Sequence, residues 1–188
     1  MSKQRAAIFA SGTGSNFEAI MAKSDLACDI VLLVCDKPGA TVIEKAHRKE
    51  VPTYVFEPKK YASKEAYEQK LVEKLRKEQI DWIFLAGYMR IVGPTLLQAF
   101  EGRIINIHPS LLPAFPGKDA IGQAYRAGVK TTGVTVHYVD AGIDTGPIIA
   151  QREVPILPED TEDTLKQRIQ RVEHSLYPYV INQLNLKK

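Results

Sequence analysis

A histidine and an amide stand two residues apart where an apolar run breaks off into a proline-rich loop, in the sequence INIHPSLLPAFPG (residues 105–117). Side chains alternate between the two faces of a strand, so Asn106 and His108 project from one face near its carboxyl end. Pro109 has no N–H group and ends the hydrogen-bonded ladder. An imidazole and an amide placed together suit proton transfer and oxyanion stabilisation. A loop histidine that only satisfies nearby backbone groups is the alternative.

A carboxylate lies in a later loop, DAGIDTG (residues 140–146). If the fold brings Asp144 beside His108, the carboxylate favours the imidazolium and fixes the orientation of the ring. Ser110 is the nearest hydroxyl, but the intervening proline gives no reason for it to face His108. The 4 histidines have no spacing typical of a metal site. We therefore expect catalysis without a metal and without a covalent acyl-enzyme, although DAGIDTG alone is better explained as an ordinary turn.

A glycine-rich loop, SGTGSN (residues 11–16), joins the first apolar run to a helical segment. Its backbone N–H groups can approach an anion, and the helix N-terminus adds partial positive charge, which favours a phosphate. A dinucleotide site is the alternative, because Gly12 and Gly14 start a GxG pattern and Asp36 follows at a spacing of about 20 residues. Phe17 occupies the place of the third glycine, so we rank a single phosphate above a pyrophosphate. A tight turn that only needs glycine conformations also fits.

Two further segments have side chains suited to ligand contact. The segment GYMRIVGP (residues 87–94) combines an aromatic ring, a thioether and a guanidinium group, a lining suited to a flat heteroaromatic ligand with a carboxylate tail. Glu173 adjoins the apolar stripe of the last helical segment and could bind a sugar hydroxyl or an amine. The alternatives are ordinary strand-end packing, with Arg90 in solvent, and a solvated glutamate at the edge of a helix.

Short apolar runs alternate with helical patterns over the first two thirds of the chain, as in an α/β sheet with buried parallel strands. Strands are expected at residues 5–11, 29–36, 52–56, 81–87 and 103–108, and helices at 17–23, 41–50 and 63–78. The loop DAGIDTG is too short for a helical crossover, so the runs at 131–139 and 147–156 are expected to be antiparallel neighbours. A last helix starts near Thr161, and Pro178 is expected to kink or divide it.

These elements predict a single α/β domain over residues 1–188, with a mixed, mostly parallel sheet and helices on both faces. In an open α/β sheet, ligands bind beyond the carboxyl ends of the strands. SGTGSN follows the first strand, GYMR follows the fourth, and INIHPS contains the end of the fifth. We therefore expect the three polar segments to converge at one edge of the sheet.

Composition and charge narrow the function classes. The 188 residues are 45% hydrophobic and 25% charged, ordinary values for a globular domain. The net charge of +3 is spread along the chain, which argues against nucleic acid or a membrane surface as the main partner. No apolar run approaches the roughly 18 residues of a spanning helix, and no signal-peptide pattern is seen. The sequence predicts a cytoplasmic protein.

The polar segments together resemble a known family. SGTGSN, GYMR, NIHPSLLPAFPG, TGVTVHYVDAGIDTGPI and RVEHSLYP resemble the folate-dependent formyltransferase family, in particular the members that act on glycinamide ribonucleotide. The resemblance spans almost the full chain and implies a Rossmann-like formyltransferase fold. It also implies transfer of the formyl group of 10-formyltetrahydrofolate to the amine of glycinamide ribonucleotide, in purine biosynthesis. Small-molecule substrates, no metal, and a monomer or small homo-oligomer are the corresponding expectations.

The resemblance also implies roles for individual residues. The catalytic residues are Asn106, His108 and Asp144, and Glu173 binds the substrate. The phosphate of the ribonucleotide is bound by Gly14, Ser15 and Asn16. The folate-binding residues are Lys64, which stands where some relatives have arginine, and Met89, Arg90, Ile91, Val92, Asn106, Asp140, Ala141, Gly142, Ile143 and Asp144.

Three other functions stay open at the level of sequence. A methionyl-tRNA formyltransferase shares the catalytic core but normally adds a C-terminal RNA-binding domain, for which we expect no room here. A formyltetrahydrofolate hydrolase usually carries an N-terminal regulatory domain, whereas this sequence starts almost directly with its first strand. A nucleotide-binding module of the same fold would leave the catalytic residues unexplained. We therefore favour the transferase that acts on the small ribonucleotide.

Overall fold

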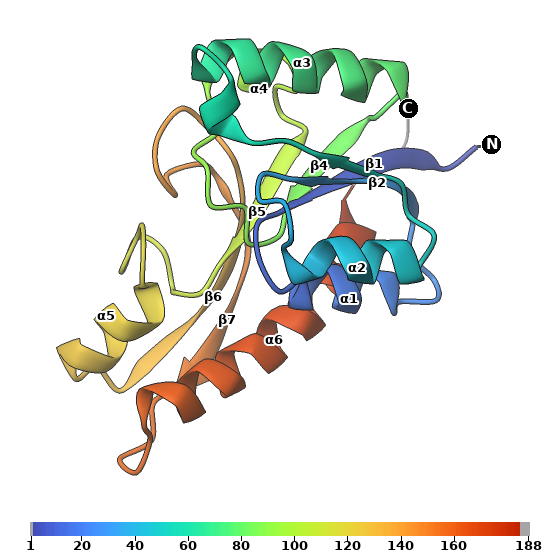
Figure 1. Cartoon of the computed structure of the whole chain (residues 1–188). Helices are drawn as coiled ribbons and strands as arrows, with labels where there is room; N and C mark the ends of the chain where they lie inside the picture. The colour runs from blue at the N-terminus through green and yellow to red at the C-terminus, as the bar shows by residue number, and fades with distance from the viewer. Residues whose placement is uncertain (1, 185–188) are drawn as a thin grey trace.

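The computed structural model describes residues 2–184, which form one seven-stranded sheet between two layers of helices (Figure 1). The strands are β1 (Gln4–Ala10), β2 (Cys28–Cys35), β3 (Thr53–Val55), β4 (Trp82–Leu85), β5 (Ile104–His108), β6 (Thr131–Tyr138) and β7 (Ile148–Pro155). The helices are α1 (Ser15–Met21), α2 (Thr41–Arg48), the 3-10 turn η1 (Pro58–Lys60), α3 (Lys64–Lys77), α4 (Pro94–Ala99), α5 (Ala120–Ala127) and α6 (Glu162–Gln183).

The sheet is mixed and mostly parallel, which confirms the predicted fold class. The strand order is β3-β2-β1-β4-β5-β6-β7. The first five strands pair in parallel, since helical crossovers connect most of them, whereas β6 pairs antiparallel with both β5 and β7. The predicted antiparallel pairing of the last two strands is confirmed.

Alternate residues of the central strands enter two separate cores. In β1, Ala6 and Ile8 pack in the cluster that α1, α2 and α6 cover, whereas Ala7 and Phe9 pack in the cluster that α3 covers. Figure 1 shows α3 and α4 on one side of the sheet and α1, α2 and α6 on the other. Burial on both faces explains why β1 reads as a continuous apolar run.

On the sheet face that α3 and α4 cover, the side chains change from apolar to polar towards β5 and β6. Ile104 and Val139 still contact the core beneath α3. Asn106, His108 and His137 lie on the same face as these two residues by strand alternation, but they are polar. Here loop atoms, such as the carbonyl oxygen of Phe115, contact the side chains of the sheet. A polar site therefore forms where the helical layer gives way to loops.

Of the two effects expected of Pro178, a kink or a division of the last helix, the division does not occur, because α6 continues through Pro178. Pro178 is buried beside Tyr177, whose hydroxyl donates to the carbonyl oxygens of Leu85 (2.8 Å) and Ile105 (3.3 Å). Burial of this turn against the sheet offsets the loss of one helical hydrogen bond.

Two short helices, α4 and α5, have no counterpart in the sequence-based prediction. The first turn of α4 is held by a contact that is distant in sequence, because the backbone N–H groups of Gly93 and Leu96 donate to the buried carboxylate of Glu68 at 2.7 and 3.2 Å. With only 6 residues, α4 is too short to show an amphipathic pattern, so local periodicity does not indicate it.

We expect Tyr177→Phe to lower the free energy of unfolding by about 1–2 kcal/mol, because a fully buried donor to two strand carbonyls is lost. Urea denaturation measures this change. The matched control is Tyr179→Phe on the same helix, since Tyr179 is 53% exposed. Equal midpoints for the two variants would contradict this account of how α6 is anchored.

Candidate active site

The end of β5 and the loop after β6 bring together one carboxylate, two imidazoles and an amide. Asp144 Oδ2 lies 3.5 Å from His108 Nδ1, and Asp144 Oδ1 lies 3.7 Å from His137 Nε2. Asn106 Nδ2 lies 3.5 Å from the same nitrogen of His137. Both histidines are buried. The structure thus places the predicted residues Asn106, His108 and Asp144 around one point and adds His137, which the sequence analysis did not include.

The pairing of β5 with β6 sets this arrangement. Asn106 lies opposite His137, and His108 lies opposite Thr135. Side chains on opposite residues of an antiparallel pair lie close together on one face of the sheet. The alternation within TTGVTVHYV could have shown that Thr135 and His137 share a face. It could not have shown which residues of β5 they meet, because register depends on the folded chain.

The contacts of His108 fix the orientation of its ring. Its Nε2 lies 2.9 Å from the carbonyl oxygen of Phe115, which can only accept, so Nε2 donates this hydrogen bond. Its Nδ1 faces the carboxylate of Asp144 at 3.5 Å. Both ring nitrogens therefore face acceptor groups.

The contacts of His137 fix the orientation of its ring as well. Its Nδ1 lies 2.8 Å from the carbonyl oxygen of Tyr138, so this nitrogen donates the hydrogen bond. Its Nε2 lies 3.5 Å from Asn106 Nδ2 and 3.7 Å from Asp144 Oδ1. His137 therefore orients the amide while Asp144 faces both imidazoles.

The loop that carries Asp144 is built by local turn chemistry. Asp140 accepts hydrogen bonds from the Thr145 hydroxyl (2.6 Å) and the Gly142 N–H (2.9 Å), and these bonds, the first above all, lower the pKa of Asp140. A Cβ on Gly146 would collide with the carbonyl oxygen of Tyr138. The ordinary turn expected from the sequence is therefore also the feature that brings Asp144 to the site.

The loop after His108 is anchored by a buried threonine. The Thr135 hydroxyl donates to the Ser110 carbonyl oxygen at 2.7 Å and accepts from the Leu112 N–H at 3.1 Å. Ser110 Oγ donates to the Ala114 carbonyl oxygen at 2.6 Å. The structure thus supports the prediction that Ser110 is not directed at His108.

The glycine loop lies at the carboxyl end of β1, as expected. Gly14 has φ +77°, and a Cβ there would collide with Val42, so both the backbone and the packing require glycine. Asn16 is buried, and its Oδ1 has no hydrogen-bond partner within residues 2–184. An unpartnered buried acceptor in this loop is consistent with a ligand contact.

The burial and the contacts of Asp36 argue against a dinucleotide site. Its side chain is fully buried and accepts from Ser11 Oγ at 2.5 Å and from Arg90 Nε at 3.0 Å. A carboxylate enclosed in this way is not free to bind a ribose. Arg90 pairs with this carboxylate while its side chain stays 43% exposed, so the alternative of strand-end packing with Arg90 in solvent stays open.

The predicted folate-binding residues form two exposed segments. Met89, Ile91 and Ile143 are large exposed apolar side chains. Val92 packs in the core beneath α3, so only its backbone can reach a ligand. Lys64 Nζ donates to the Ile91 carbonyl oxygen at 2.8 Å and so ties α3 to the first segment.

Glu173 is buried on α6, contrary to the alternative of a solvated residue. It is 8% exposed, and within residues 2–184 no hydrogen-bond donor or cation pairs with its carboxylate. This burial raises the pKa of Glu173 to about 7. An unpaired buried carboxyl group on an otherwise apolar stripe is a candidate for contact with a ligand.

Comparison with known proteins identifies the family. Residues 4–181 match the family model described as formyl transferase. The chain belongs to the formyl transferase family. It is 59% identical to the phosphoribosylglycinamide formyltransferase of Bacillus subtilis (strain 168), over 95% of this chain and 93% of that protein.

Two further similarities extend this result. The crystal structure of glycinamide ribonucleotide transformylase 1 from Geobacillus kaustophilus has a TM-score of 0.95 and 62% identity, covering 98% of this chain and 100% of that one. The trifunctional purine biosynthetic protein adenosine-3 of Drosophila melanogaster is 43% identical over 97% of this chain and 14% of that protein. The predicted formyltransferase fold is thereby confirmed.

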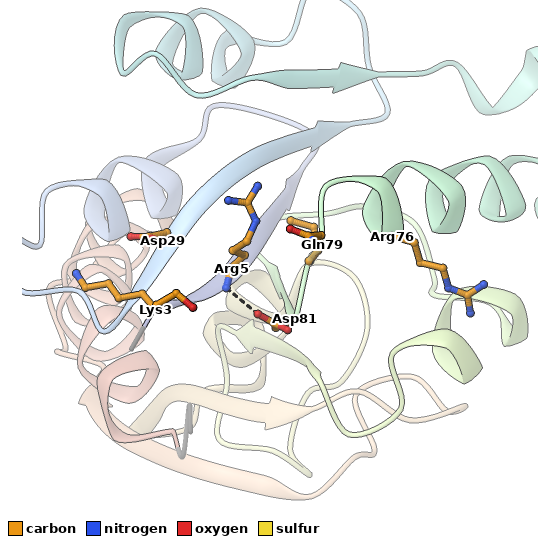
Figure 2. Close-up of a pocket in the computed structure, with 8 residues that line it drawn as sticks. Lys3, Arg5, Asp29, Arg76, Gln79 and Asp81 are labelled. Carbon is orange, nitrogen blue, oxygen red and sulfur yellow. Dashed lines mark hydrogen bonds between the residues drawn. The ribbon is translucent and has the colours of Figure 1, made fainter. Parts of the chain in front are cut away.

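A cavity of about 510 Å³ in this formyl transferase lies at the opposite edge of the sheet (Figure 2). Its lining includes Lys3, Arg5, Asp29, Arg76 and Asp81, near the amino ends of β1, β2 and β4 and the end of α3. Its charges are mixed, and the Arg5 N–H already donates to Asp81 Oδ2 at 2.9 Å. This cavity is separate from the candidate active site.

Two further observations concern residues 2–184 of this formyl transferase. No helix there has both the length and the apolar character needed to cross a membrane. No group of three or more histidine, cysteine, aspartate or glutamate side chains there is arranged to hold a metal ion.

Glu173→Gln is expected to change how the stability of this formyl transferase depends on pH. The folded-state pKa of about 7 lies above the ordinary 4.5, so Glu173 contributes stability that is fully present below about pH 4.5 and is lost as the pH rises through 7. The variant should match the native protein near pH 4.5 and exceed it at pH 8 by on the order of 3 kcal/mol.

Urea denaturation at both pH values measures this difference. Glu159→Gln is the control, because Glu159 is exposed just before α6. A Glu173→Gln variant with the same pH dependence as the native protein would contradict the buried, unpaired state of Glu173.

Proposed function

We propose that the chain transfers the formyl group of 10-formyltetrahydrofolate to the amine of glycinamide ribonucleotide, in purine biosynthesis. The observation that carries this proposal is the position of Asp144 against His108, with the Asn106 amide on the same face of the sheet. Family membership and the names of the similar proteins support the reaction class and the acceptor.

The reaction proceeds by attack of the neutral glycinamide nitrogen on the formyl carbon. A C–N bond forms, and the carbonyl π electrons move to oxygen, giving a tetrahedral intermediate. The doubly protonated ring of His108 and the amide of Asn106 stabilise the oxyanion, each as a hydrogen-bond donor. The C–N bond to the folate then breaks, and the electron pair stays on the folate nitrogen.

In this scheme Asp144 acts first as the general base and then as the general acid. It accepts the proton that the attacking amine loses, through an ordered water, and returns it to the departing folate nitrogen. The same carboxylate stabilises the charged ring of His108 across 3.5 Å. Its Oδ2 also accepts from the Gly117 N–H at 2.8 Å, which fixes its orientation.

The carbonyl oxygen of Phe115 occupies the position that we assign to the formyl oxygen of the substrate. It accepts from His108 Nε2, the donor that the proposal directs at the formyl oxygen. Phe115 has φ +50°, a conformation that bulky residues rarely adopt. Binding of the formyl group therefore exchanges this internal hydrogen bond for one to the substrate.

The remaining predicted residues bind the two substrates. The ribonucleotide phosphate contacts Gly14, Ser15 and Asn16, and Glu173 contacts the ribonucleotide at its hydroxyl or amine. The folate lies against the exposed Met89, Ile91 and Ile143, with Lys64 and Arg90 as the nearby cations and Asp140, Ala141, Gly142 and the backbone of Val92 completing its contacts.

The proposal keeps the broader expectations from the sequence. Both substrates are small molecules, the formyl donor is a co-substrate, and no metal takes part. The chain acts as one formyltransferase domain over residues 1–188, in the cytoplasm, as a monomer or small homo-oligomer.

His108→Ala is expected to lower the turnover number about 10²–10³-fold, because one oxyanion donor is lost.

Asp144→Asn should lower the turnover number on the order of 10²-fold with little change in the affinity for the ribonucleotide, because proton transfer is lost. The absorbance change on consumption of 10-formyltetrahydrofolate measures both. His47→Ala is the control, since His47 is exposed on α2.

The native chain must consume the folate only when glycinamide ribonucleotide is present. Consumption without it would favour a hydrolase, and transfer to methionyl-tRNA would favour the RNA-directed enzyme. Absence of any consumption by the folded chain would overturn the proposed activity, and near-normal turnover of Asp144→Asn would remove Asp144 from the mechanism.

A further inference from the structure

Asp36 is a buried carboxylate that the mechanism above does not use. Its side chain is fully buried at the carboxyl end of β2, while its partner Arg90 is 43% exposed. One oxygen accepts from Ser11 Oγ, and the other accepts from Arg90 Nε. Burial of an ionised carboxylate is costly unless it is paired, so these two donors account for its presence in the core.

The partners of Asp36 belong to the two segments that bind different substrates. Ser11 begins the glycine loop at the end of β1, and Arg90 lies in the segment after β4. Ser11 Oγ also accepts from the Met89 N–H at 2.8 Å, and the Ser11 N–H donates to the Gly87 carbonyl oxygen at 3.1 Å. The two segments are therefore joined directly, and Asp36 is shared between them.

The direction of each hydrogen bond in this network is fixed. The single hydroxyl hydrogen of Ser11 points to Asp36, because the carboxylate accepts this hydrogen bond, and Ser11 Oγ accepts in turn from the Met89 N–H. Arg90 uses Nε for Asp36, so the two terminal nitrogens of its guanidinium group are not needed for this contact. An uncharged amide in place of the carboxylate has only one acceptor oxygen. If that oxygen stays with Arg90, the Ser11 hydroxyl hydrogen loses its acceptor, and the charge that pairs with the guanidinium group is lost.

We propose that Asp36 is a positioning residue that holds the glycine loop and the Met89–Arg90 segment in one arrangement, so that the two substrates bind cooperatively. This inference rests on the proposed function, in which the first segment binds the ribonucleotide phosphate and the second binds the folate. A substrate that holds one segment in place also holds the other segment through Asp36, so the second substrate binds to a segment that is already held. The coupling is reciprocal by thermodynamic necessity.

The test compares binding in the native protein, Asp36→Asn and Asp29→Asn. Glycinamide ribonucleotide and tetrahydrofolate form an unreactive pair, because the formyl group is absent. Calorimetry measures the dissociation constant of each ligand with and without the other. In the native protein we expect each ligand to raise the affinity of the other about fivefold or more. In Asp36→Asn this factor should fall to about 1.

Asp29→Asn is the matched control, since the same change is made at an exposed position at the other end of β2. It should keep the native coupling factor. In steady-state assays, Asp36→Asn should raise the KM of both substrates while the turnover number at saturation stays near the native value. General damage to the fold would instead lower the turnover number as well.

Ser11→Ala gives an independent test, because it leaves the pair of Asp36 and Arg90 in place but removes the donor from the glycine loop. It should also reduce the coupling factor, and it serves if Asp36→Asn fails to fold. Independent binding of the two ligands to the native protein, or native coupling in both variants, would overturn the inference alone. Failure of the native protein to bind either ligand would overturn the proposed function with it.

Discussion

In the pairing of β5 with β6, Asn106 lies opposite His137 and His108 lies opposite Thr135. The whole candidate site depends on this register. A shift by one residue would turn these side chains to the opposite face, into the core beneath α6. The register is held by the apolar residues that alternate with them, such as Ile105 and Val136, which are fully buried. The hydrophobic core on one face thus fixes the polar geometry on the other.

Asp144 reaches this site on a loop that is ordered by its own short-range contacts. The turn closed by Asp140 and Thr145 needs no other part of the fold, whereas the Gly117 N–H that binds Asp144 comes from the loop after β5. The carboxylate therefore lies between two loops and two histidines. Because water is largely excluded there, each charge has a stronger effect on its neighbours than it would have at the surface.

Two other buried carboxylates hold the segment between β4 and α4. Asp36 binds Arg90 within it, and Glu68 binds the Gly93 N–H where it enters α4. Lys64, one turn before Glu68 on α3, holds the carbonyl oxygen of Ile91. The segment has no regular secondary structure, so these contacts replace the ladder hydrogen bonds it lacks. They leave the apolar side chains of the segment free to meet a flat ligand.

The strands, the long helices, the mixed sheet and the shared face of Asn106 and His108 can be predicted from the sequence alone, because they follow from alternation and from short-range turn chemistry. Three features become visible only in the folded chain: His137 joins the site, the Asp36 side chain is enclosed by Ser11 and Arg90, and Glu173 is buried. Each of these depends on contacts between residues tens of positions apart. Register and burial are properties of the packed chain, and no local pattern specifies them.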